Sequence, residues 1–186
     1  MNNVVEKALI GVAMVVLTDK AGKRYSFTTS TKADAKVEIE EGKRVELVIK
    51  GVLKAQRHFD STIKGVQVTF EDNMFLPEVV ALLQGGTVVK DAEGRFVSYT
   101  PPVAGHAPDV EPFDIDIYTE ETDTSGLVLG YARLSLPNGR GEPVELSFED
   151  DRFFAARYTI HTAPASGEPP YTITMVEALP KLNTGD

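Results

Sequence analysis

Hydrophobic and polar residues alternate along most of the chain with the period of two that is typical of β-strands. The alternation is clear at residues 45–50, 113–118, 144–148, 157–161 and 171–175. Strands with one apolar and one polar face suit antiparallel sheets that pack face to face. The pattern therefore predicts a mostly β fold, an antiparallel β-sandwich or barrel of two packed sheets with long loops or arms.

The segment Ala8–Thr18 differs because it is apolar on both faces. Its apolar run is about half the roughly 20 residues that a membrane-spanning helix needs. Glu6 beside Lys7, and the lack of a small-residue cleavage site, disfavour a signal peptide. The valine content instead predicts a β-strand at about residues 4–18 whose two faces are both covered.

One short helix is predicted at about residues 76–84. Pro77 suits the first helical position, and Gly85 suits the left-handed position after the last turn. Asp72 or Asn73 is the candidate cap just upstream. A helix of about two turns is not stable alone, so it must pack on a sheet. The apolar stripe available for this packing consists of Val79, Leu82 and Leu83.

The stretch Thr100–Pro112 contains four prolines. Proline has no backbone N–H to donate to a strand ladder, so the stretch is predicted to be a long loop or arm on the surface. The chain has 186 residues, of which 42% are hydrophobic and 25% charged. Both values are those of a globular protein, and residues 1–186 are expected to form a single domain.

The charge is strongly uneven. The net charge is −9, yet residues 1–60 carry 11 Lys and Arg against 8 Asp and Glu, which leaves residues 61–186 with 8 against 20. This balance argues against a general nucleic-acid-binding protein, which needs a basic face. The asymmetry would help copies attract one another head to tail, or would line an acidic channel that repels DNA phosphates. A solvated acidic surface is the alternative interpretation.

No pattern of catalytic or cofactor-binding residues is visible. The chain has no cysteine, its three histidines are isolated, and no glycine-rich phosphate-binding motif is present. The carboxylate groups at Asp114/Asp116 and at 149–151 lack the spacing of a calcium loop. The sequence therefore predicts no catalytic residue, no cofactor and no metal site.

The segment Val66–Thr87 reads VQVTFEDNMFLPEVVALLQGGT, an alternating strand followed by a polar turn, the predicted helix and Gly-Gly. This combination resembles the major tail proteins, or tail tube proteins, of long-tailed bacteriophages. The likeness continues through Asp91–Tyr99, Thr100–Pro112 and Phe113–Glu120, and covers about Lys50–Pro180.

The resemblance implies a structural, non-enzymatic virion protein made in the host cytoplasm. Tail tube subunits are β-sandwiches that form hexameric rings, and the rings stack into a hollow tube that conducts DNA. The implied partners are further copies of the chain, the tape-measure protein in the lumen, and the tail terminator and baseplate or distal tail proteins. DNA would pass through without specific binding, and no membrane insertion is implied.

The resemblance also suggests where such contacts would lie. The acidic strand face of Asp114 and Asp116, and more weakly Glu46, are candidate lumen-lining residues. Edge pairing and head-to-tail stacking require exposed strands and arms on each subunit. The candidate assembly residues lie on the predicted N-terminal strand and in the proline-rich loop; they are Leu9, Val12, Met14, Val16, Pro101, Pro102 and Pro108.

Three alternatives remain at this stage. The first is a tube subunit of a contractile tailocin or injection system, because these particles use subunits related to tail tube proteins. A terminator or baseplate ring built on the same fold would stop at one ring. A soluble β-sandwich module that binds carbohydrate or protein would stay monomeric.

Overall fold

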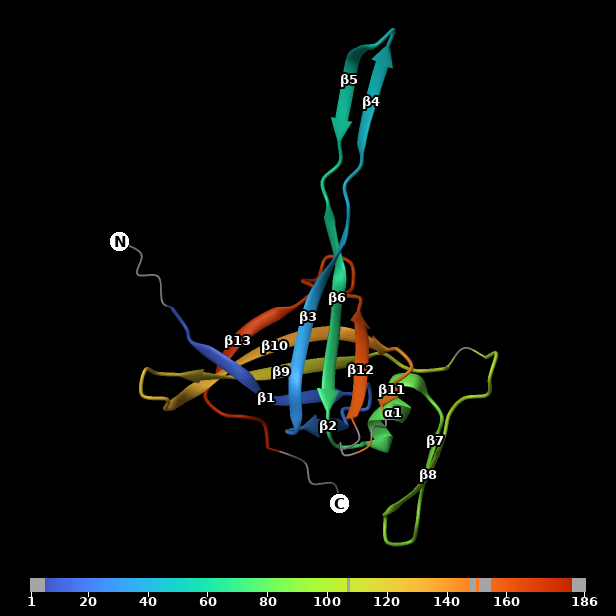
Figure 1. Cartoon of the computed structure of the whole chain (residues 1–186), viewed down its shortest axis with the longest axis vertical. Helices are drawn as coiled ribbons and strands as arrows, with labels where there is room; N and C mark the ends of the chain where they lie inside the picture. Colours follow the sequence, from blue (N-terminus) through green and yellow to red (C-terminus); the bar gives the residue numbers. More distant parts are fainter. Residues whose placement is uncertain (1–5, 107, 148–149, 151–154, 182–186) are drawn as a thin grey trace.

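The structure is a computed structural model that describes residues 6–106, 108–147, 150 and 155–181. Within these residues the chain forms thirteen strands and one short helix. The strand pairs are antiparallel. The predicted fold class, a mostly β antiparallel architecture with one flanking helix, is confirmed (Figure 1).

The body of the molecule is a nine-stranded sheet, and two separate hairpins project from it. The body strands are β1 (Leu9–Thr18), β2 (Arg24–Phe27), β3 (Ser30–Glu40), β6 (Thr62–Asp72), β9 (Phe113–Thr122), β10 (Val128–Gly141), β11 (Glu145–Ser147), β12 (Ala155–Thr162) and β13 (Thr172–Val176). The hairpin strands are β4 (Arg44–Ile49) with β5 (Val52–His58), and β7 (Thr87–Lys90) with β8 (Phe96–Thr100).

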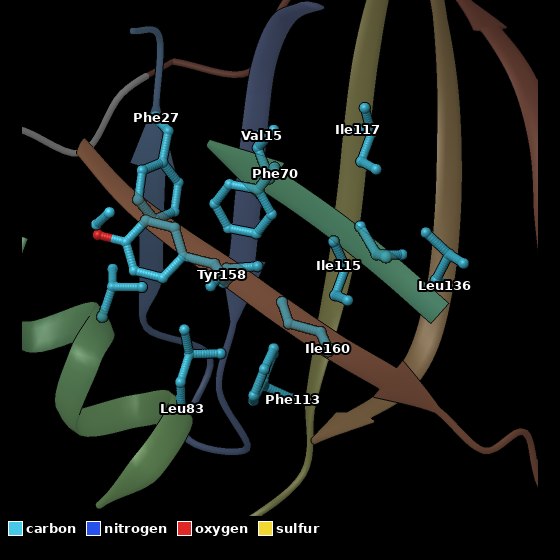
Figure 2. Packing of buried hydrophobic residues seen from close by; sticks show 14 of the residues in the cluster. Val15, Phe27, Phe70, Leu83, Phe113, Ile115, Ile117, Leu136, Tyr158 and Ile160 are labelled. Atoms are coloured by element: carbon cyan, nitrogen blue, oxygen red, sulfur yellow. The ribbon is translucent and has the colours of Figure 1, made fainter. Parts of the chain in front are cut away.

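The sheet runs in the order β2-β1-β9-β10-β12-β6-β3, with β13 beside β10 and β11 beside β12. β10 changes partner along its length: Tyr131–Ser135 pair with β13, whereas Gly139–Gly141 pair with β12. A register shift between Leu136 and Gly139 separates the two parts. The sheet therefore bends there, and β3, β6 and β12 cross over β1, β9 and β10 as a second layer (Figures 1 and 2).

The core fills the space between these two layers. An aromatic group of Phe27, Phe70 and Tyr158 lies at one end, with ring centroids 5.0–5.8 Å apart. Figure 2 shows these rings beside aliphatic side chains from both layers, including Val15 of β1 and Ile160 of β12. Side chains of this size contribute roughly 1.5–3 kcal/mol each when fully buried, so this cluster is the main stabilising feature of the fold.

The helix α1 (Pro77–Gln84) lies within one residue of its predicted bounds. Its start differs in detail, because Leu76 is the N-cap and makes no side-chain capping bond. Gly85 (φ 76°) ends the helix as predicted. Leu83 is fully buried against Gly141 of β10, where an added Cβ would lie 2.6 Å from the Leu83 Cβ. The absence of a side chain at position 141 therefore allows the helix to close on the sheet.

Strand β4 departs from the expected sandwich. Residues 45–50 alternate as predicted, but β4 pairs only with β5, and the two strands form an arm that extends away from the body (Figure 1). Every residue of both strands is exposed. The expectation that the apolar face of this strand packs in the subunit core is wrong, because no second layer of the body reaches it.

Asp72 at the end of β6 has a role other than capping. Its carboxylate is fully buried and accepts hydrogen bonds from Thr29 Oγ1 (2.5 Å), Ser30 Oγ (3.4 Å) and the Met74 backbone N–H (2.8 Å). The start of β3 is thereby joined to the turn that follows β6 at the end of the core. The carboxylate and the burial of the ring also act on Tyr158: burial first, and Asp72 second, raise the pKa of Tyr158 to about 12.

We predict that Asp72→Ala lowers the free energy of unfolding by about 2–4 kcal/mol, because it removes a buried acceptor that three hydrogen-bond donors share, among them the buried Ser30 hydroxyl. Urea denaturation followed by circular dichroism measures this loss. Glu71→Ala, on the exposed face of the same strand, is the matched control and should change the value by less than about 0.5 kcal/mol. Equal effects of the two substitutions would show that the Asp72 hydrogen bonds do not stabilise the fold.

Candidate assembly surfaces

The most prominent surface is the apolar face of the arm formed by β4 and β5. Val45, Leu47 and Ile49 alternate along one face, and Val52 lies directly opposite Ile49. Directly opposed residues of an antiparallel pair share a face. These four side chains retain 48–58% of their surface exposed. An isolated two-stranded hairpin with such a face is only marginally stable in water, so the arm has a surface suited to contact with another molecule.

The opposite face of the arm is polar near the body and apolar at the tip, where Val48 lies opposite Leu53 and both side chains are exposed. Glu46 lies opposite Gln56, and Arg44 lies opposite His58. Arg44 forms an ion pair with Glu46 (2.6 Å) and a hydrogen bond to the Gln56 side chain (2.7 Å). Residues 43–58 contain five Lys or Arg side chains against the single Glu46. The arm is therefore basic, with apolar side chains along one face and on both faces at its tip, whereas the rest of the chain is acidic.

The arm meets the body at a narrow neck, where the two strands approach very closely. A Cβ built on Gly42 would lie 1.8 Å from the Phe59 backbone oxygen, so only glycine fits at this position. The Phe59 backbone N–H donates to the Lys43 carbonyl (2.9 Å), and Gly42 N–H donates to Ser61 Oγ (3.1 Å). Two hydrogen bonds thus join the two strands of the arm at the neck.

A second candidate surface is the acidic face of β9. Asp114 and Asp116 lie on the outer face of the sheet, beside a shallow depression of about 490 Å³ that Glu168 also lines. Asp116 accepts a hydrogen bond from Ser135 Oγ (2.5 Å) and lies 4.0 Å from Arg133 Nε. Asp114 is exposed and accepts from the Asn138 backbone N–H (3.1 Å). The structure thus brings these two candidates together on one face.

Glu46, the third candidate for the lumen lining, does not lie on the acidic face of β9. Glu46 lies on the arm, and Figure 1 shows that the arm projects away from the layer that contains β9. The structure does not bring Glu46 beside Asp114 or Asp116. The sequence could not separate these positions, because alternation along a strand does not show where the strand lies.

The four candidates on the N-terminal strand fall into two groups. Leu9 is 47% exposed and Val12 is half-buried, whereas Met14 and Val16 are 3% and 4% exposed. Met14 and Val16 pack against Tyr118 in a small second core, which Ala13, Tyr131, Val176 and Leu179 cover. This corrects the expectation for Met14 and Val16, because the chain itself covers that face. Residues 4 and 5 of the predicted strand lie outside the described residues.

The candidates in the proline-rich loop lie at the end of α1. Pro101 and Pro108 are exposed and Pro102 is half-buried. A Cβ at Gly85 would lie 3.4 Å from Pro102 and 3.5 Å from Pro108, so the loop folds back over the helix terminus. The loop carries an exposed apolar side chain, Val103, at 74% exposure. It is a surface loop, and it lies against the helix terminus of the same chain.

A metal site in the described part of the chain would need several carboxylate or histidine side chains close together. No set of three His, Asp or Glu side chains there could hold a metal ion. Of the carboxylate group at 149–151, residues 149 and 151 lie outside the described residues. His161 lies between two glutamates, a contact that the sequence gave no sign of. Among the described residues, no helix has the length and apolar character needed to span a membrane.

No protein-family model and no curated protein sequence matches the chain. Three solved structures are similar over nearly its whole length. A chain of the sheath–tube complex of an extracellular contractile injection system, PVC, in the extended state is 11% identical with a TM-score of 0.49, covering 90% of this chain and 92% of that chain.

The tube-terminating cap of the anti-feeding prophage is 14% identical with a TM-score of 0.46, covering 94% of this chain and 97% of that chain. The baseplate of the same particle is 6% identical with a TM-score of 0.41, covering 95% and 97%.

The placement of the N-terminal strand gives a direct test. We predict that Met14→Ala lowers the free energy of unfolding by about 2–4 kcal/mol, because it opens a cavity in the second core. Leu9→Ala, on an exposed part of the same strand, should cost less than about 1 kcal/mol. Thermal and urea denaturation of the two variants measure the difference. An unchanged free energy of unfolding for Met14→Ala would contradict the burial of this side chain by its own chain.

Proposed function

We propose that this chain is a structural, non-enzymatic subunit that assembles with further copies of itself into stacked rings of a phage-tail-like tube. The observation that carries the proposal is the apolar face of the arm. A monomeric protein rarely keeps such a face on an element that extends away from its body, because the exposed apolar surface promotes association. The sequence likeness of residues 50–180 to tail tube proteins supports the same interpretation.

The charge distribution supports contact between different surfaces of two copies. A basic arm and an acidic body attract each other and disfavour contact between like surfaces. An interface between two different patches is heterologous, and such contacts form closed rings or open filaments. Both products are needed in a tube, in which rings close and stacks remain open.

The remaining features fit a tube wall. β3 and β13 are edge strands that each pair on one side within the described chain, so each leaves a row of backbone groups available to a neighbour. In this proposal the Asp114 and Asp116 face lines the lumen, where negative charge prevents DNA from binding. Rings of sixfold symmetry, passage of DNA, and contacts with the tape-measure, terminator and baseplate proteins all belong to the proposal.

Electron microscopy of the purified protein over a range of concentrations tests the proposal. We expect hollow tubes with a regular axial repeat, or rings that stack as the concentration rises. Discrete rings that never stack would favour a terminator or baseplate ring. A protein that stays monomeric at the highest concentration, with or without a glycan ligand, would contradict the proposal.

The arm provides the specific variant. Leu47→Ser with Ile49→Ser should abolish assembly, because it makes two of the four apolar side chains on this face of the arm polar and changes no residue of the body. The free energy of unfolding of the body should change by less than about 0.5 kcal/mol, since both residues are exposed. Glu46→Ser with Gln56→Ser, on the polar face of the same arm, is the matched control and should still assemble. Assembly of the Leu47/Ile49 variant at wild-type concentrations would show that the arm face is not an interface.

A further inference from the structure

The side chain of His161 on β12 is held at both of its ring nitrogens. Nδ1 lies 2.8 Å from Glu38 Oε1 on β3, and Nε2 lies 2.7 Å from Glu142 Oε1, directly after β10. The three side chains are only partly exposed, at 36% for His161, 39% for Glu38 and 51% for Glu142. One imidazole therefore connects β12 and β3 of the second layer to the segment that follows β10.

This contact lies at the base of the arm. Glu38 is the last residue of β3 before a register shift between Glu38 and Ile39, where the β3–β6 ladder is interrupted. On the other strand, Gly65 faces Glu38, and a Cβ there would lie 1.9 Å from the Thr162 carbonyl oxygen. β12 and β6 are thus pressed together beside His161. Beyond the register shift, Ile39 and Glu40 pair with Ile63 and Thr62, and after these two pairs the chain leaves the sheet for the arm.

The protonation state of His161 decides whether both contacts are favourable. The imidazolium ion donates from both nitrogens, so it satisfies both carboxylates. The neutral ring donates from one nitrogen only, and its other nitrogen presents a lone pair to a carboxylate oxygen. Burial acts to lower the pKa of His161, but the hydrogen bonds to Glu142 and Glu38 outweigh it, and the pKa is raised above its usual range.

Other charges surround this group. Gln67 of β6, which is uncharged, is paired with His161 and lies between it and Lys36 of β3. Lys64 of β6 pairs with Glu40 at 3.2 Å. The charged residues on the strands around His161, and directly after β10, are Lys32, Asp34, Lys36, Glu38 and Glu40 on β3, Lys64, Glu71 and Asp72 on β6, Arg133 and Arg140 on β10, Glu142 after β10, Glu145 on β11, and Arg157 on β12. Glu38 and Glu142 are the groups among these that contact the ring.

We propose that Glu38, His161 and Glu142 form a proton-dependent latch that fixes the arm on the body. With His161 protonated, the latch ties the end of β3 to β12 and to the segment after β10, so the arm leaves the body in one direction. With His161 neutral, one of the two ties is lost, and the neck becomes free to bend at the register shift. The latch acts within one chain and does not depend on what the arm contacts.

The direction of the pH dependence follows from the raised pKa. Stabilisation of the neck is complete below the ordinary histidine pKa, and it is lost as the pH rises through the folded-state value. We therefore expect backbone amides at 38–43 and 59–65 to exchange with deuterium about fivefold faster, after correction for intrinsic exchange, when the pH rises from about 6 to about 9. The measurement uses the full chain at a concentration at which it is monomeric.

His161→Gln should remove this pH dependence, and the neck amides should exchange rapidly at both pH values. His58→Gln on the exposed part of the arm is the matched control and should retain the wild-type response. Core amides of β9 should not respond in any of the proteins. A pH-independent neck in the wild type, or a pH-dependent neck in His161→Gln, would overturn the latch. Neither outcome bears on whether the protein forms tubes, since the experiment measures monomers.

Discussion

The pairing of β10 with two different strands, β13 and β12, determines how the body folds into two layers. One part of this strand hydrogen-bonds to β13 and the other part to β12, while β9 follows it on the opposite side. The bend between the two parts turns one continuous sheet into two facing layers, and the aromatic core fills the space between them. The same bend places β3 and β6 across β1 and β9, so the arm that continues from them points away from the body (Figure 1).

Local signals explain which parts of this structure the sequence predicted. Pro77 and Gly85 mark the two ends of α1, and the strand period is fixed by residues that are adjacent in the chain. The acidic face of β9 also follows from alternation, because Asp114 and Asp116 need only share one side of one strand. These features depend on contacts within a few residues, which is the range over which sequence patterns are informative.

The features that the sequence did not predict depend on contacts between distant residues. The alternation in β4 is the same whether its apolar face meets the core of its own subunit or stays exposed on an arm. Met14 and Val16 are buried because residues near 176–179 return to cover them. His161 meets Glu38 across a separation of 123 residues. Sequence spacing gives no measure of such pairings, which the fold as a whole decides.

The junction of arm and body also determines how mechanical force enters the subunit. β3 and β6 both continue into the arm, and β3 is an edge strand, so a pull along the arm reaches the rest of the sheet through the β6–β12 ladder. This ladder is paired without interruption from Val66–Thr162 to Asp72–Ala156, and its strands run along the direction of the arm (Figure 1). A force in that direction loads its hydrogen bonds in shear and all at once, instead of opening them one at a time. A strand geometry of this kind lets a thin arm bear tension without unfolding the body to which it is attached.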